Sequence, residues 1–141
     1  MKKIIAIVLL MFSQSGWSQE RLDALLDGLH QDAHEGNFQS YFARYSSDAI
    51  VLGTDKTERW TIEEFKSYAK PAFEDGHGWT YTLVERNWEG DGDTRWFDEI
   101  LFNEKLGHCR GTGAVSYTHL RAHETKAKLV CRLLLEKKNK P

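Results

Sequence analysis

The chain has few of the residues that mark several classes of protein. Its 141 residues include only two cysteines and two prolines, and no Cys-X-X-Cys motif occurs. Two cysteines provide neither a disulfide framework nor a zinc cluster, although the sequence permits one disulfide between Cys109 and Cys131. Two prolines exclude a proline-rich linker, and an aromatic content of 12% argues against disorder. The composition indicates one small globular domain.

The main part of the chain also lacks an excess of positive charge. The formal net charge is −2, but residues 19–115 carry 10 Lys and Arg against 19 Asp and Glu, a net of −9. Residues 116–141 carry 7 against 2, a net of +5. Because nucleic-acid binding requires a basic face to neutralise phosphates, we expect no nucleic-acid partner.

No apolar run is long enough to span a bilayer. The run Ile4–Phe12 has nine residues, whereas a transmembrane helix needs about 20. Two lysines precede this run, and the small residues Gly16 and Ser18 follow it, which is typical of a secretory signal peptide cleaved before Gln19. We therefore predict a signal peptide over residues 1–18, an exported protein in the periplasm or outside the cell, and no membrane insertion after cleavage.

Helical periodicity dominates the first half of the remaining chain. Apolar residues from Leu22 to Ala33 recur at the spacing of one helix face, and Gly36 is expected to end that helix. Residues 38–45 predict a short aromatic helix. Thr61–Glu64 has the sequence of a capping box, so we expect a helix to begin there and Pro71 to kink or end it.

The second half has the period of two that is typical of strands. Residues 48–53 predict a short buried strand, and the segments Trp79–Trp88, Arg95–Asn103 and His108–Val115 predict an antiparallel meander with glycine-containing turns. Helices followed by a meander favour an α+β layer fold, in which the helices lie on one face of a curved sheet.

Several short motifs resemble one family. They are Leu52-Gly53-Thr54-Asp55, Glu58-Arg59-Trp60, Gly78-Trp79-Thr80-Tyr81, Trp96-Phe97-Asp98-Glu99 and Arg110-Gly111-Thr112-Gly113. In this order they resemble the SnoaL-like group of the NTF2-like superfamily over about residues 20–115. The resemblance implies an NTF2-like α+β cone, with a curved antiparallel sheet wrapped around about three N-terminal helices and a cavity at the wide end. It also implies pairing through the sheet as a homodimer.

The resemblance stops near Val115, where the family's last strand with its tryptophan is expected. Residues 116–141 are interpreted as an adapter-derived artefact that replaces the native last strand, in agreement with the reversal of charge. The alternative is a genuine C-terminal helix with an apolar stripe. Without its last strand the sheet would expose an edge and the chain would be prone to aggregate, although Leu129–Leu135 can pair there in part.

Five residues are candidates for lining the cavity: His30, Trp60, Asp98, Glu99 and Arg110. His30 borders the apolar face of the first helix and is a candidate base or ligand donor, or a packed core histidine. Asp98 and Glu99 are adjacent in a strand, so only one of them can face the cavity. Arg110 is either an ion-pair partner of that carboxylate in the cavity or a buried structural arginine of the sheet. Trp60 either lines the mouth of the cavity or fills the core.

No metal or cofactor is expected. His30 and His34 are spaced as a metal pair on a helix, but no third ligand has a telling spacing. The sequence leaves three functions open, and the choice between them depends on whether a cavity exists and which side chains line it. The first is an exported protein that binds a small, partly apolar molecule. The second is an isomerase, cyclase or hydrolase that uses a cavity carboxylate with His30 or Arg110. The third is a non-catalytic dimeric interaction module.

Overall fold

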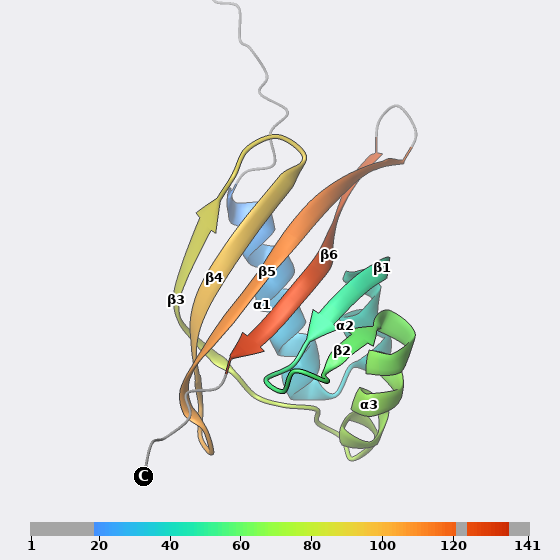
Figure 1. Ribbon diagram of the computed structural model, residues 1–141, viewed down its shortest axis with the longest axis vertical. Helices are drawn as coiled ribbons and strands as arrows, with labels where there is room; N and C mark the ends of the chain where they lie inside the picture. The colour runs from blue at the N-terminus through green and yellow to red at the C-terminus, as the bar shows by residue number, and fades with distance from the viewer. Residues whose placement is uncertain (1–18, 121–123, 136–141) are drawn as a thin grey trace, which may run out of the picture.

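Figure 1 shows a curved sheet with the helices packed against one side of it. The computed structural model describes the backbone of residues 19–120 and 124–135 and the side chains of residues 19–116. Within these residues the chain forms three helices and six strands. In chain order they are α1 (Gln19–Glu35), α2 (Phe38–Ala43), β1 (Tyr45–Leu52), β2 (Arg59–Thr61), α3 (Ile62–Glu74), β3 (Thr82–Glu89), β4 (Thr94–Asn103), β5 (Gly107–Leu120) and β6 (Glu124–Leu135).

The sheet has the strand order β2-β1-β6-β5-β4-β3, and only the β1–β6 pair is parallel. The register shifts between Leu83 and Glu85 on β3 and between Ala114 and Val115 on β5. Such irregularities increase the local twist, which bends a sheet. The predicted α+β class with a curved, mostly antiparallel sheet is confirmed.

The periodicity of the sequence explains the helices. Leu22, Leu26, Leu29 and Ala33 are all buried along one face of α1, which ends before Gly36 at a φ of 73°. The predicted capping box begins α3: the Thr61 hydroxyl accepts a hydrogen bond from the Glu64 N–H, and Glu64 Oε2 accepts one from the Thr61 N–H at 2.7 Å. These bonds satisfy backbone donors that the first turn leaves open.

Several boundaries differ from the sequence prediction. The aromatic helix expected over residues 38–45 ends at Ala43, and β1 begins at Tyr45 rather than at residue 48. Pro71 does not end α3, and the helix continues for three more residues to Glu74. The proline is exposed, and its ring removes only one backbone hydrogen-bond donor from the helix. The short strand β2 was not expected, because three residues carry too little periodicity to be recognised. β3 begins at Thr82 rather than at Trp79, since residues 77–81 run outside the sheet ladder.

The C-terminal segment contributes a strand that joins β5 to β1, and not the helix that was the alternative expectation for it. β6 pairs with β5 over Arg110–Leu120 and with β1 in parallel, so the pairing expected in part for Leu129–Leu135 extends over the whole strand. The register places Cys131 opposite Ala114, five positions along β5 from Cys109, which corresponds to about 16 Å. A disulfide needs Cα atoms less than about 7 Å apart, so the bridge left open by the sequence does not fit this register.

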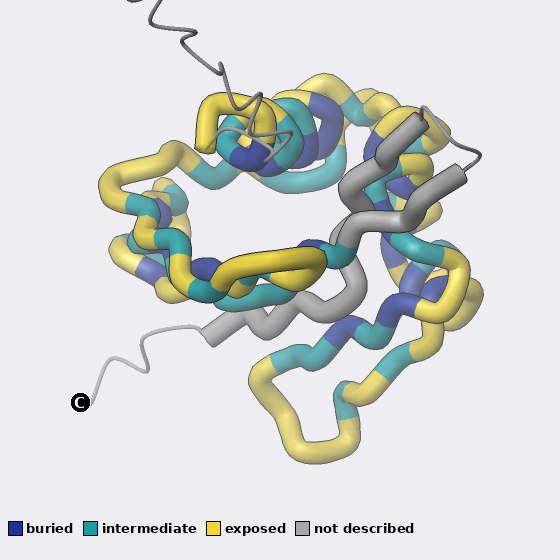
Figure 2. The backbone as a smooth tube through the Cα atoms, turned by 90° about the horizontal axis from the view of Figure 1, so that it is seen from above, coloured by how far each residue is buried: buried dark blue, intermediate teal, exposed yellow. Residues whose placement is uncertain are grey.

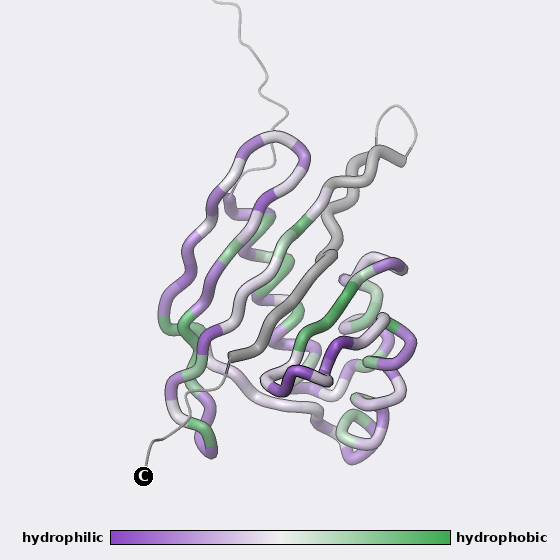
Figure 3. Tube along the Cα trace, viewed as in Figure 1, coloured by the Kyte–Doolittle hydropathy of each residue, from purple (hydrophilic) through white to green (hydrophobic). Residues whose placement is uncertain are grey.

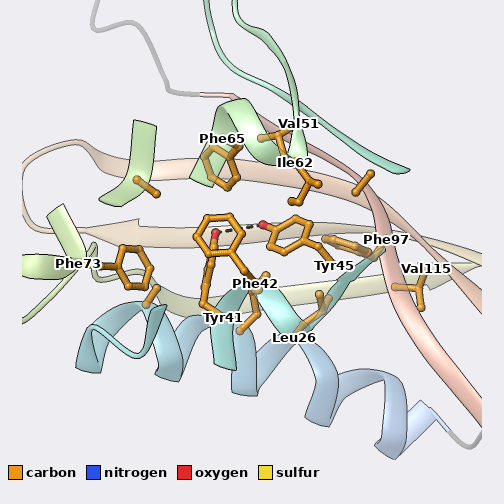
Figure 4. Close-up of a cluster of buried hydrophobic side chains, with 14 of the residues drawn as sticks. Leu26, Tyr41, Phe42, Tyr45, Val51, Ile62, Phe65, Phe73, Phe97 and Val115 are labelled. Carbon is orange, nitrogen blue, oxygen red and sulfur yellow. Dashed lines mark hydrogen bonds between the residues drawn. The ribbon is translucent and has the colours of Figure 1, made fainter. Parts of the chain in front are cut away.

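The hydrophobic core lies where α2 and α3 meet α1 and β1. Figure 4 shows aromatic rings in close contact there, including Tyr41, Phe42, Tyr45, Phe65 and Phe73. Edge and tilted ring contacts of this kind add to the stability gained from burying apolar area. The hydroxyls of Tyr41 and Tyr45 are 3.0 Å apart and form a buried hydrogen bond, so neither polar group is left without a partner.

Hydropathy and burial follow the same arrangement. Figure 3 shows hydrophobic residues along the second half of β1, which lies next to the edge strand β2, and mostly hydrophilic residues along the other edge strand, β3. Figure 2 shows buried positions on both the helices and the strands, and exposed positions in the turns, on the outer sides of the helices and along β3. A polar edge strand is one means by which sheets avoid pairing with other chains. Among the described helices, none combines the length and the apolar character that a membrane crossing requires.

Candidate functional site

The two adjacent acids of β4 point to opposite sides of the sheet. Glu99 is buried, with 2% of its side chain exposed, on the face that packs against α1. Asp98 lies on the outer face, where its Oδ1 is 3.3 Å from Nη1 of the half-exposed Arg110. Because strand neighbours alternate between faces, one acid of the pair had to face inward, and the structure assigns that place to Glu99.

Both carboxylate oxygens of Glu99 have partners. Oε1 accepts a hydrogen bond from Nε of Arg86, its cross-strand neighbour on β3, at 2.8 Å. Oε2 lies 2.9 Å from Nε2 of His30 on α1. An ionised carboxylate only accepts hydrogen bonds, so the His30 Nε2 must carry the proton in this contact.

Arg86 connects this pair to the acidic side of α1. Its side chain is 5% exposed, and its two Nη atoms lie 3.1 Å from Asp23 Oδ1 and 2.9 Å from Asp27 Oδ1. The indole N–H of Trp88 also donates to Asp23 Oδ1. Burial lowers the Arg86 pKa, but Glu99 and the hydrogen bonds to both aspartates raise it by more, so the net shift is upward.

These six residues form what we call the Glu99 network: Asp23, Asp27, His30, Arg86, Trp88 and Glu99. The sequence analysis missed Arg86 and both aspartates. A signal was present, because Arg86 and Trp88 are two positions apart in a strand and therefore share the face that packs against α1. An arginine on such a face requires buried acids, and Glu99 is the cross-strand acid in register with it.

His30, like Asp27, is a member of the network that borders open space. Its side chain is 10% exposed, and it lines a groove of about 370 Å³ between α1 and the beginning of β3, which we call the His30 groove. Within the described residues, the only recorded partner of the imidazole is Glu99. With Nε2–H directed at Glu99, Nδ1 remains as the ring atom that can accept a proton or a ligand hydrogen bond.

Trp60 belongs to a separate pocket of about 170 Å³. Its walls are largely aromatic, and we call it the aromatic pocket; they include Trp60, Phe65, Tyr68, Trp79, Tyr81 and the carboxyl-bearing Glu58. The ring of Trp60 stacks on Tyr68 at a centroid distance of 4.8 Å and an angle of 21°. The Trp79 indole nitrogen is buried, and it has no hydrogen-bond partner among the described atoms.

The open spaces are neighbours. Tyr81 lines the aromatic pocket, the His30 groove and a third cavity of about 620 Å³ beside His77 and Lys105. The structure therefore brings His30 and Glu99 into contact and places Trp60 in an adjoining pocket. It does not bring Asp98 or Arg110 to either space. Arg110 had been a candidate partner for the inward carboxylate; that position is taken by Arg86 because Arg86 shares the inner face with Glu99.

The structure does not extend the His30–His34 pair into a larger ligand set. His34 Nδ1 lies 2.9 Å from the Thr80 hydroxyl, while His30 Nε2 is directed at Glu99. Among the residues that the structure describes, no group of three or more His, Cys, Asp or Glu side chains is placed to hold a metal ion.

Comparison with protein families gives a match to the SnoaL-like domain over residues 22–121. The chain belongs to the SnoaL-like family. The match extends six residues beyond Val115, where the resemblance of the sequence motifs stops, and reaches the end of β5. Curated proteins gave no match to this SnoaL-like chain.

Solved structures place the SnoaL-like chain among NTF2-like folds. A protein of unknown function with a cystatin-like fold from Nostoc punctiforme superposes with a TM-score of 0.67 at 14% identity, covering 87% of this chain and 93% of its own. An NTF2-like protein from Pseudomonas putida gives 0.63 at 10% identity, covering 85% and 89%. One from Cytophaga hutchinsonii gives 0.64 at 10%, covering 85% and 98%. Likeness at this identity establishes the cone-shaped fold, and function must be argued from the site.

Proposed function

We propose that this SnoaL-like chain binds a small, partly apolar molecule in the aromatic pocket. The observation that carries the proposal is a recess with five aromatic walls that also contains a carboxylate and a buried indole N–H without a recorded partner. Binding sites typically combine apolar walls with a few polar groups that fix the orientation of the ligand. A volume of about 170 Å³ lies below the usual range for drug-sized ligands, so the ligand, or the part of it that enters, is small.

The pair Trp60 and Trp96 allows a matched test. Trp60 lines the pocket, whereas Trp96 is 53% exposed on the outer face of β4. The thermal midpoint of the full chain should rise with a panel of small polar and apolar molecules, because a ligand that binds only the folded state stabilises it. Trp60→Ala should abolish the rise and Trp96→Ala should retain it. Equal responses of the two variants, or no response of the wild type to any panel member, would contradict the proposal.

Proton transfer at the His30 groove is a second candidate function, and the buried contact between His30 and Glu99 favours it. Glu99 has both oxygens occupied, so it acts as a positioning residue that holds the imidazole with Nε2 protonated. His30 Nδ1 is then the candidate base. This is the logic by which a carboxylate fixes the tautomer and orientation of a catalytic histidine.

Isotope exchange tests this second candidate. A bound ligand with an acidic C–H bond, recovered from the protein in D₂O, should contain deuterium that mass spectrometry detects. Positioned acid–base groups contribute about 100-fold or more, so His30→Ala should lower the exchange rate by at least that factor. Unchanged exchange in His30→Ala would exclude His30 as the base, while ligand retention in that variant would leave the binding proposal intact.

We also propose that the chain is exported by a signal peptide over residues 1–18, which lie outside the described residues. The support is the sequence pattern alone: two lysines, the apolar run Ile4–Phe12 and the small residues before Gln19. Fractionation of cells that express the full chain should find a shortened protein outside the cytoplasm. Leu9→Asp, which places a charge within the apolar run, should leave an uncleaved cytoplasmic precursor. A wild type retained at full length in the cytoplasm would overturn this proposal.

A further inference from the structure

We infer that the molecule bound in the aromatic pocket carries a small quaternary or tertiary ammonium group. The inference rests on the proposed function and specifies the class of ligand. It depends on three observations: a carboxylate without a recorded cationic partner, aromatic walls around it, and an acidic protein body. Each of them favours a positively charged organic group over a neutral or anionic one.

Glu58 is an acid whose position is built into the loop after β1. Its Oε2 accepts a hydrogen bond from the Asp55 backbone N–H at 3.1 Å, and its own backbone oxygen accepts one from the Gly53 N–H. A side chain at Gly53 would overlap Oε2 of Glu58, so the glycine leaves the space that the folded-back carboxylate occupies. Both residues line the pocket. The loop therefore holds the carboxylate at the pocket wall.

No basic side chain within the described residues forms an ion pair with Glu58. Its recorded hydrogen bonds are to backbone groups, and the two nearest basic residues in the sequence, Lys56 and Arg59, are exposed. Glu99 differs, because Arg86 already compensates its charge. A partly buried carboxylate gains from a cation brought by a ligand, since water solvates it less well than at the open surface.

The aromatic walls suit the same group. Trp, Tyr and Phe rings attract cations through the negative potential of their faces, and recognition of quaternary ammonium groups by clustered rings is the best-known use of this attraction. The pocket contains two tryptophans, Trp60 and Trp79, which give the strongest such interaction. Tyr68 stacks on Trp60 and is 61% exposed, so it stands at the rim, where a ligand enters.

Charge and size act in the same direction. Residues 19–115 carry a net charge of −9, and with the +5 of residues 116–141 the net charge is still −4, which favours cations over anions near the protein. The volume of about 170 Å³ is suited to a compact head group. An alkylammonium group has apolar methyl or methylene surface for the rings and a single positive charge for Glu58, so it satisfies both components of the wall.

The inference can be tested with two probes of the same shape, one positively charged and one neutral. Choline and dimethylbutanol, in which a carbon atom replaces the charged nitrogen, are titrated by calorimetry into the full chain. Choline should bind the wild type about five- to tenfold more tightly than dimethylbutanol, as expected for a cation beside aromatic rings and a carboxylate. Glu58→Gln keeps the acceptor for the Asp55 N–H and should remove most of this preference. Glu85→Gln, which deletes an equal charge on an exposed position of β3, should retain it.

Tyr68 separates the effect of the ring from that of the charge. Because this side chain is largely exposed, Tyr68→Leu should leave folding unchanged while it weakens choline binding more than dimethylbutanol binding. Tyr68→Phe should retain the affinity for choline. This pattern supports a cation held against the ring face.

The remaining outcomes overturn the inference in distinguishable ways. Equal binding of the two probes, or a preference for choline that Glu58→Gln does not change, overturns the ammonium class and leaves a neutral ligand in the same pocket. Failure of choline to bind at millimolar concentration also overturns the ammonium class. The proposed function itself fails if no panel member stabilises the wild type, or if Trp60→Ala responds to the stabilising ligands as Trp96→Ala does.

Discussion

Asp98 and Glu99 are neighbours in one strand, and each pairs with an arginine on an adjacent strand, yet the two pairs lie in opposite environments. On the outer face, Asp98 and Arg110 are 35% and 52% exposed. On the inner face, Glu99 and Arg86 are 2% and 5% exposed and share further partners on α1. The same chemical pair is therefore a solvated contact on one side and part of the closed Glu99 network on the other. Burial decides which of them can influence folding and chemistry.

The largest expected effect comes from removing the buried acid. Glu99→Ala leaves Arg86 charged and without its closest buried partner, which should lower the free energy of unfolding by about 3–5 kcal/mol. Asp98→Ala removes an exposed pair and should cost less than about 1 kcal/mol. Urea unfolding followed by far-UV circular dichroism measures both. Similar losses for the two variants would show that the faces do not differ as described.

Replacing both members of the buried pair sharpens the comparison. Arg86→Met combined with Glu99→Leu should be more stable than Glu99→Leu alone, because no buried arginine is left uncompensated. The coupling free energy between the two positions should be about 2 kcal/mol in a double-mutant cycle. Purely additive losses would mean that the two side chains act independently.

The α3 cap provides a third, fully exposed environment for a carboxylate. Thr61→Ala removes the hydroxyl that accepts from the Glu64 N–H and should cost about 1 kcal/mol near neutral pH. Hydrogen bonds from the Thr61 backbone N–H, and then from its hydroxyl, lower the Glu64 pKa. Thermal unfolding of Thr61→Ala against the wild type measures the loss.

The sign of this shift sets a pH dependence. A carboxylate with a lowered pKa in the folded state contributes stability above its unfolded pKa, about 4.3, and loses it as the pH falls through the folded-state value. Below about pH 4 the wild type should therefore lose stability relative to Glu64→Gln, which does not titrate. A constant difference between the two proteins from neutral to acidic pH would contradict the cap geometry.

The smallest effect is expected at Arg110. Its ion pair with Asp98 is solvated and screened, so Arg110→Ala should change the free energy of unfolding by less than about 0.5 kcal/mol, and high salt should abolish the difference. The measurement is urea unfolding at low and high ionic strength. A loss approaching that of Glu99→Ala would place Arg110 in a buried role that the structure does not show.

The elements with strong periodicity were predictable from the sequence. The stripe from Leu22 to Ala33, the capping box at Thr61 and the alternating strands gave the helices and the meander because local pattern and tertiary packing agree there. β2 was missed because three residues carry no period. The role of the C-terminal segment was not predictable from composition, since the place of β6 between β1 and β5 depends on contacts with strands distant in sequence.

The site was predictable only in part. Alternation along β4 showed that one of Asp98 and Glu99 faces inward but not which one, since that depends on how the sheet lies on α1. His30 was identified from its place beside the apolar face of its helix. Arg86 and Glu58 were not identified, because the role of each depends on groups that only the fold brings close. Arg86 contacts Glu99 and the aspartates of α1, and Glu58 lies among aromatic rings.

The central claim is that ligands enter the aromatic pocket and leave the outer face of the sheet untouched. The indole N–H signals of Trp60, Trp79 and Trp96 in an ¹H–¹⁵N NMR spectrum, each assigned by substitution with phenylalanine, report on it directly. Titration with choline or dimethylbutanol should shift the signals of Trp60 and Trp79 and leave that of Trp96 in place. A shift of Trp96 without any change at Trp60 and Trp79 would contradict the claim.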